Sequence, residues 1–172
     1  MGNTQLFCGK RFSFCAVLFF LAIHVGCGSP SPDKMFADRF DSRIKKLAVL
    51  YSTFQARNNW TGPADEGEFR EYINGISEKR LARLEITKAQ VETLFQIDRD
   101  GQPYKIRWSI AGGNGVPPKP ILFEANGADG KYLVGFTNGI SQEYSKDDYD
   151  KLWNGEGDDG SMIGFNAEDT RQ

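Results

Sequence analysis

The sequence predicts an α+β fold, with a long N-terminal amphipathic helix and shorter helices packed on a small antiparallel sheet of three to four strands. Two observations predict this class. Apolar residues recur at steps of three and four over residues 33–57, which is the period of a helix. From about residue 97 the apolar period changes to two, and turn residues separate short runs, as in antiparallel strands. We therefore expect a single domain over residues 33–153, with the long helix on one face of the sheet.

The predicted helix over 33–57 has one apolar stripe and a charged opposite face. The stripe consists of Phe36, Phe40, Ile44, Leu47, Ala48, Tyr51 and Phe54. The opposite face carries acidic and basic side chains in mixed order. Such a face is typical of a solvated helix surface above a single core stripe, although its basic residues leave contact with anionic lipid or a partner helix open.

Three further helix starts carry a capping residue followed three positions later by an acid or amide. The pairs are Asp65 with Glu68, Thr87 with Gln90, and Ser145 with Asp148. The helix that starts at Asp65 is expected to end near Asn74-Gly75. Residues 78–84 are expected to add a turn or two. The last helix should pack Tyr149, Leu152 and Trp153 inward.

Four short strands are expected in the second half of the chain, at 104–110, 121–125, 131–136 and 140–143. The first alternates most cleanly, because Tyr104, Ile106, Trp108 and Ile110 are separated by polar residues. Asn138-Gly139 is a hairpin signal between the last two strands. The Gly- and Pro-rich segment 111–120 is expected to be a loop, and it lacks the context of a phosphate-binding motif. The acidic, Gly-rich residues 154–172 are expected to form a disordered tail.

The N-terminal segment 1–26 has the layout of a secretory signal peptide. Lys10 and Arg11 precede an apolar run over 12–26, and Gly26 stands before Cys27. A helix of that run would span about 22 Å, which is short of the ~30 Å hydrocarbon core of a bilayer. A removable signal is therefore favoured over a retained anchor helix.

Residues 23–27 resemble the lipobox of bacterial lipoproteins. Gly26 and Cys27 match that pattern, whereas His24 stands where Leu, Val or Ile is preferred. The resemblance implies that Cys27 becomes the acylated N-terminus, and residues 27–32 then read as the anchor cysteine and a Gly/Ser/Pro tether. It places the protein in the cell envelope, bound to the membrane and facing the periplasm or the outside. Simple secretion remains the alternative.

Removal of the signal also removes most of the reactive side chains. His24 is the only histidine of the chain, and Cys8 and Cys15 leave together with it. The remaining chain has no Ser-His-Asp or Cys-His machinery, no histidine metal site and no intrachain disulfide. Loss of Lys10 and Arg11 takes the net charge from −2 to −4, which argues against a nucleic-acid partner. We expect no cofactor.

Two turns resemble oxygen-rich cation sites. One contains Asp98 and Asp100, and the other contains Asn126 and Asp129. Neither completes the six to eight oxygen ligands that a hard cation such as calcium prefers, so plain turns are favoured. These four residues are the weak cation-binding candidates.

Acids and tryptophans offer two other candidate groups. Glu66, Glu68, Asp147 and Asp148 have the residue type that glycan hydrolysis requires, but each is better explained as a helix-start residue. Of the three tryptophans, Trp108 and Trp153 fall in apolar stripes and are expected in the core. Trp60 falls in a polar loop, where it could contribute to a sugar-binding surface.

Residues 100–107 and 126–130 resemble segments of the globular domain of type II secretion major pseudopilins. In that family an Asp-x-x-Gly-x-Pro-Tyr run enters a strand and a Gly-Ala-Asp-Gly segment follows later, and the loops can hold calcium. The resemblance therefore implies, weakly, that Asp100 and Asp129 bind calcium. The N-terminus departs from the family, because Gly9 is followed by Lys10 and the apolar run contains no Glu.

The expected function is that of a small, lipid-anchored, non-catalytic envelope protein with an interaction or structural role. Its partners would be the membrane, through the lipid, and an envelope protein that the sequence does not identify. A pseudopilin-like component of a secretion or pilus system is the first alternative. A carboxylate-dependent envelope enzyme is the second.

Overall fold

The computed structural model describes residues 41–161, in which helices pack with a four-stranded antiparallel sheet. The α+β prediction is therefore confirmed. The predicted signal peptide, Cys27 with its predicted tether, the first part of the predicted long helix and residues 162–172 lie outside the described residues. Within 41–161 no helix combines the length and the apolar character that a membrane crossing requires. The helices are α2 Arg43–Arg57, α3 Glu66–Asn74, α4 Glu78–Ala82, η1 Lys88–Gln90, η2 Glu92–Phe95 and α5 Lys146–Trp153, and the strands are β1 Lys105–Ile106, β2 Pro120–Phe123, β3 Tyr132–Phe136 and β4 Ser141–Tyr144.

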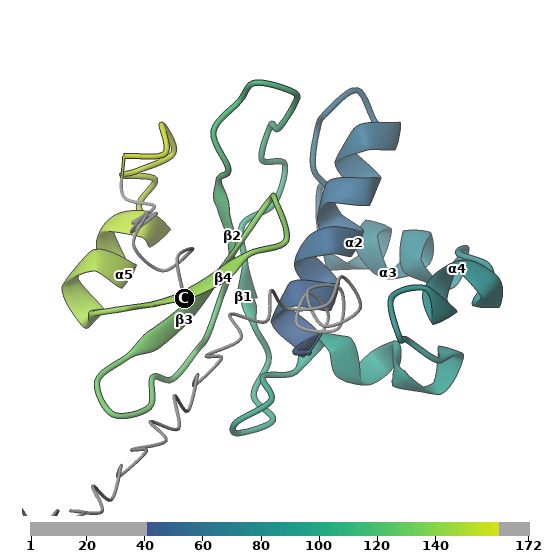
Figure 1. Cartoon of the computed structure of the whole chain (residues 1–172), viewed down its shortest axis with the longest axis horizontal. Coiled ribbons are helices and arrows are strands. Elements are labelled where there is room, and N and C mark those ends of the chain that lie inside the picture. The colour runs from purple at the N-terminus through teal and green to yellow at the C-terminus, as the bar shows by residue number, and fades with distance from the viewer. Residues whose placement is uncertain (1–40, 162–172) are drawn as a thin grey trace, which may run out of the picture.

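The sheet is a simple meander with strand order β1-β2-β3-β4, and each strand is antiparallel to the next. Figure 1 shows α2, α3 and α4 on one side of this sheet and α5 on the other. The hairpin between β3 and β4 forms at Asn138-Gly139, as predicted. Gly139 has φ +81°, a conformation that glycine adopts without a steric cost, and its N–H donates to the Phe136 carbonyl at 2.9 Å.

Helix α2 begins at Arg43, and the backbone of Ser42 just before it is extended (φ −130°, ψ 154°). The predicted helix therefore does not run through 41–42. The cap comes from a distant residue, because Asp98 accepts a hydrogen bond from the Arg43 N–H at 2.9 Å. The same carboxylate pairs with the Arg43 guanidinium at 3.0 Å. Asp98 thus satisfies one of the free N–H groups at the helix start.

The first strand is shorter than predicted, since only β1 pairs with β2 and the expected run was 104–110. Ser109 has φ +54°, which breaks the extended backbone. Its N–H donates to the Pro63 carbonyl at 2.8 Å, so the chain leaves the sheet to pair with the segment that follows α2. Tyr51 supports this departure, because its buried hydroxyl donates to the Arg107 carbonyl at 2.9 Å. Burial raises the pKa of Tyr51 to about 12.

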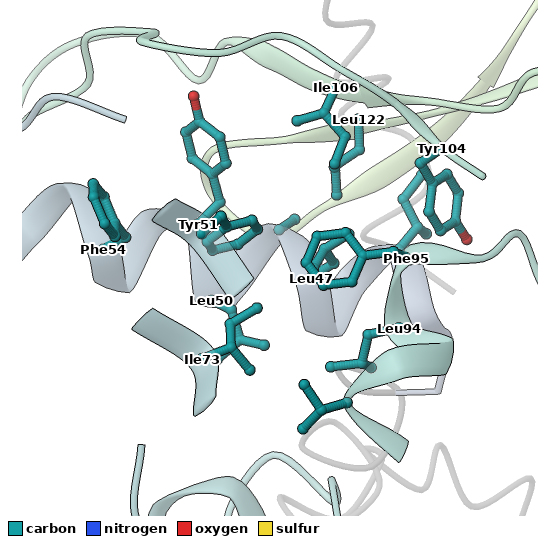
Figure 2. Close-up of a cluster of buried hydrophobic side chains, with 14 of the residues drawn as sticks. Leu47, Leu50, Tyr51, Phe54, Ile73, Leu94, Phe95, Tyr104, Ile106 and Leu122 are labelled. Atoms are coloured by element: carbon teal, nitrogen blue, oxygen red, sulfur yellow. The ribbon is translucent and has the colours of Figure 1, made fainter. Parts of the chain in front are cut away.

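The core has two parts, one on each face of the sheet. The larger part lies between α2, α3, η2 and the sheet, and Figure 2 shows its side chains converging on α2. Phe69 is fully buried there and meets the ring of Tyr51 edge-on, with centroids 5.6 Å apart. The smaller part joins α5 to the sheet through Phe123, Val134, Phe136, Tyr144, Tyr149 and Leu152.

The predicted caps and the last helix are largely confirmed. Asp65 and Ser145 accept hydrogen bonds from the backbone of the residue three positions on, and α3 ends at Asn74. The pair Thr87 and Gln90 also forms a capping box, although the segment it opens is a 3₁₀ turn.

Residues 154–161 were expected to begin the disordered tail, but they form turns that pack on the domain. Both carboxylate oxygens of Asp158 accept from the Arg107 guanidinium, at 2.7 and 2.9 Å. Such a bidentate pair fixes both distance and orientation. These residues therefore belong to the folded domain.

Candidate functional site

The structure separates the four predicted cation ligands into two places. Asp98 caps α2, as described above. Asp100 lies instead beside Asn126, whose amide donates to its carboxylate at 3.1 Å. The other oxygen of Asp100 accepts from the Gln102 N–H at 2.9 Å and so closes the turn locally. Asp129 follows in the same loop as Asn126, with φ +52°. Two segments that are distant in sequence thus meet at one end of the sheet.

Arg99 provides the positive charge at this end of the sheet. Its guanidinium pairs with Glu124 at 3.4 Å and also with Glu143 on β4. Asp129 contributes a further electrostatic attraction, and these acids together hold the pKa of Arg99 above its usual value, with the Glu143 hydrogen bond as the largest cause. Among residues 41–161 no set of three or more His, Cys, Asp or Glu side chains is arranged to hold a metal ion.

Glu124 is a buried acid that the sequence analysis did not single out. Its side chain is 1% exposed, and one carboxylate oxygen accepts from the Leu133 N–H at 2.9 Å. Burial raises the pKa of this carboxyl, and nearby Asp100 and Glu143 raise it further, whereas the Leu133 N–H and Arg99 oppose the shift. The sequence feature that could have indicated its burial is its position directly after the apolar run of β2. Because the carboxylate is enclosed, it offers no surface to a substrate.

The four acids considered for glycan hydrolysis lie at two helix starts. Glu66 and Glu68 are in the first turn of α3, and Asp147 and Asp148 are in the first turn of α5. Figure 1 shows these two helices on opposite sides of the sheet. Asp148 is held by Ser145 and by Lys151 at 3.0 Å. The structure therefore does not bring the two pairs together.

The three tryptophans have different environments. Trp108 packs against the larger core cluster, with its ring 6.3 Å from that of Phe69. Trp153 was expected in the core, but it is 39% exposed, with its ring edge-on to that of Phe123. It is the last residue of α5. Trp60 is 41% exposed, in agreement with its prediction as a loop aromatic.

Trp60 borders a surface hollow of about 230 Å³ between α2, the segment 112–118 and the β3-β4 hairpin. Figure 1 shows the end of α2 and the long β1-β2 connection at the same end of the molecule. The side chains around the hollow are uncharged, and they include Ser52, Gln55, Asn114, Pro117 and Thr137.

The backbone around Trp60 is held in an unusual conformation. Asn59 and Trp60 have φ values of +50° and +62°, a region that L-residues other than Asn and Asp rarely adopt. The Trp60 N–H donates to the Gln55 carbonyl at 2.8 Å, and its own carbonyl accepts from the Gly112 N–H at 2.8 Å. These bonds hold the Trp60 backbone at the rim of the hollow, and strained backbone of this kind concentrates at functional sites.

The described residues thus contain two candidate sites: the cluster of Arg99 with the buried Glu124 and the exposed Glu143, and the open hollow beside Trp60. A comparison of the chain with protein-family models, with curated proteins and with solved structures found no match.

Proposed function

We propose that this chain is a lipid-anchored protein of the cell envelope, with a non-catalytic interaction role. The observation that carries the proposal is the N-terminal pattern: Lys10-Arg11, the apolar run 12–26, and Gly26 directly before Cys27. After cleavage Cys27 would be the only cysteine of the chain, placed at the new N-terminus ahead of a Gly/Ser/Pro tether.

Acylation at Cys27 would supply a stable anchor. Each buried CH₂ contributes about 0.8 kcal/mol to membrane binding, and more than one acyl chain is needed for stable attachment. A diacylated cysteine meets that requirement without a spanning helix. The non-catalytic role is supported by the loss of His24 with the signal and by the enclosure of Glu124.

Metabolic labelling with a fatty-acid probe tests the anchor. We expect the wild-type chain to take up label and the Cys27→Ser variant to take up none. Cys15→Ser is the matched control, since it changes a cysteine of the signal that cleavage removes, and it should label like the wild type. An unlabelled wild-type protein, or equal labelling of Cys27→Ser, contradicts the proposal.

A pseudopilin-like component of a secretion or pilus system is the second candidate. The hydrogen bond between Asn126 and Asp100 favours it, because it places the two segments that resemble pseudopilins side by side. The two candidates predict different mature N-termini, at Cys27 for the lipoprotein and near Lys10 for the pilin-like protein. The intact mass of the protein isolated from cells distinguishes them. We expect the mass of a chain that begins at an acylated Cys27.

A further inference from the structure

The hollow beside Trp60 combines an exposed aromatic ring with neutral polar groups. None of the side chains that line it carries a charge, although a quarter of the whole chain is charged (26%). A site for a phosphate, a carboxylate or an ammonium group would normally offer an opposite charge. The lining therefore favours a ligand that is neutral and that presents both apolar and hydrogen-bonding surface.

Apolar contact would come from Trp60 and its neighbours. The indole is 41% exposed, and Val116, which also lines the hollow, is equally exposed at 41%. Pro117 and Pro118 complete the apolar wall. A rigid, exposed indole offers a large flat contact area at a low entropy cost, which is why tryptophan dominates many binding sites. The C–H face of a sugar ring is a surface of matching shape.

Hydrogen bonds would come from the other side of the hollow. The side-chain amide of Asn114 is exposed and forms no hydrogen bond with residues 41–161. Asn138 and Thr137 add an amide and a hydroxyl, both already oriented by backbone contacts to Ile140 and Lys119. Amide and hydroxyl groups both donate and accept, so they suit the hydroxyl and acetamido groups of a sugar.

The hollow is built before any ligand arrives. The Trp60 backbone is held by two hydrogen bonds, and Gly112 lies so close to Gln55 that a Cβ there would be 2.9 Å from the amide nitrogen. The Gln55 amide in turn donates to the Ile110 carbonyl at 2.7 Å. A prearranged rim reduces the ordering cost of binding. At about 230 Å³ the hollow is smaller than the ~300–1,000 Å³ pockets that enclose drug-sized ligands, so it fits one ring of a longer chain.

We propose that this hollow binds a neutral saccharide, with one ring stacked on Trp60 and its polar substituents on Asn114 and the β3-β4 hairpin. The saccharide class follows from the hollow alone. The identity of its source, a glycan strand of the envelope, rests on the proposed envelope location. A proline-rich peptide is the less favoured ligand, since peptide grooves of that kind are lined by several aromatic rings and this hollow contributes one.

The test is calorimetric titration of the full chain with a tetrasaccharide of β-1,4-linked N-acetylglucosamine, with a proline-rich peptide titrated in parallel. We expect the tetrasaccharide to bind and the peptide not to bind. Trp60→Ala should weaken saccharide binding by about tenfold or more. Asn114→Ala, which removes an exposed side chain without a hydrogen bond in the described residues, should weaken binding without a change in melting temperature.

Trp153→Ala is the matched control, because Trp153 has a similar exposure (39%) but belongs to α5, and its loss should leave saccharide affinity unchanged. Sedimentation with purified peptidoglycan sacculi then separates an envelope glycan from a soluble oligosaccharide. Pelleting that depends on Trp60 supports the envelope source, and tetrasaccharide binding without pelleting supports the saccharide site but assigns it a soluble ligand.

Three results would overturn the inference: no tetrasaccharide binding, binding that Trp60→Ala leaves intact, or binding of the proline-rich peptide alone. Failure of the lipid anchor is measured independently by the labelling of Cys27. A chain that binds the tetrasaccharide through Trp60 but takes up no fatty acid would keep the site and reject the anchor.

Discussion

Glu124 is the acid whose position is least expected from its chemistry. A carboxylate that is 1% exposed is costly unless it is paired and hydrogen-bonded, and this one has both kinds of partner. Arg99 supplies the opposite charge at 3.4 Å and Leu133 supplies a backbone N–H. The carbonyl of the same residue also accepts from the Tyr149 hydroxyl at 2.6 Å, which connects it to α5. Glu124 therefore connects Arg99, β3 and α5.

The raised pKa of Glu124 has a definite sign in the pH dependence of stability. In the folded state the carboxyl has a pKa above 4.5, the ordinary value that it has in the unfolded chain. At a pH between the unfolded-state and the folded-state pKa, the folded state therefore binds more protons than the unfolded state. The contribution of this group to the free energy of unfolding therefore decreases as pH rises from about 4.5. We expect urea unfolding between pH 4 and 7 to show that Glu124→Gln gains stability relative to the wild type as pH rises. A difference that is flat with pH would contradict the shift.

At the scale of elements, the helix starts show which capping signals are used. Asp65 accepts from the Glu68 N–H at 2.9 Å, and Glu68 reaches back to the Ala64 N–H at 2.6 Å. Together these two bonds satisfy two backbone donors at the start of α3. Ser77 occupies the same position before α4, but its side chain makes no capping hydrogen bond. Both residues are of a type that caps helices, but only Asp65 forms the capping hydrogen bond.

Asp65→Ala and Ser77→Ala form a matched pair for this difference. Asp65→Ala should lower the free energy of unfolding by about 1 kcal/mol, because it removes a cap hydrogen bond and a negative charge at the helix start. Ser77→Ala should change it by less than about 0.5 kcal/mol. Both values are measured by urea denaturation. An equal loss in the two variants would show that the Asp65 hydrogen bond contributes nothing measurable.

For the molecule as a whole, the close approach of α2 to the sheet depends on one glycine. Val134 and Phe136 belong to the core cluster that contains α5, and Gly135 between them lies against the opposite helix. A Cβ at Gly135 would be 2.9 Å from a side-chain carbon of Ile44 and 3.2 Å from Leu122. Both neighbours are fully buried, so neither has free space to move into.

Gly135→Ala should therefore lower the free energy of unfolding by about 1–3 kcal/mol through overpacking. Gly75→Ala is the control, because Gly75 has an ordinary helical φ of −74° and a Cβ there would make contacts no shorter than 3.4 Å. That variant should be neutral or slightly stabilising. Thermal and urea unfolding measure both, and a neutral Gly135→Ala would mean that α2 can move away from β3.

Most elements could be predicted from the sequence, because their signals are local. A capping residue and its partner lie three positions apart, and strand alternation and the Asn138-Gly139 turn extend over a few residues. The strand at 104–110 was overestimated because alternation does not reveal what the backbone pairs with. The Arg107 N–H still donates to the Ile121 carbonyl of β2, but at Ser109 the chain bonds to Pro63 instead of to the sheet.

The candidate sites divide in the same way. The exposure of Trp60 was predictable from its polar neighbours, but the hollow beside it is formed by three segments that only the fold brings together. The sequence places Asp100 and Asn126 in two separate turns. Their hydrogen bond at 3.1 Å forms only because the folded sheet brings the two turns together. Glu124 was overlooked because burial of a charged residue depends on partners elsewhere in the chain.

The sequence alone determined the α+β class, the capped helix starts at Asp65 and Ser145, the hairpin and the N-terminal pattern on which the envelope proposal rests. Each of these depends on residues within a few positions of one another, where backbone geometry and hydrogen bonding act directly. Only the tertiary structure decided that Asp98 caps α2 across 55 positions, that Arg99 holds two glutamates, and that Trp60 lies at a neutral hollow. Such contacts join residues that are distant in sequence, and their energies are set by burial and close packing, which no local pattern encodes.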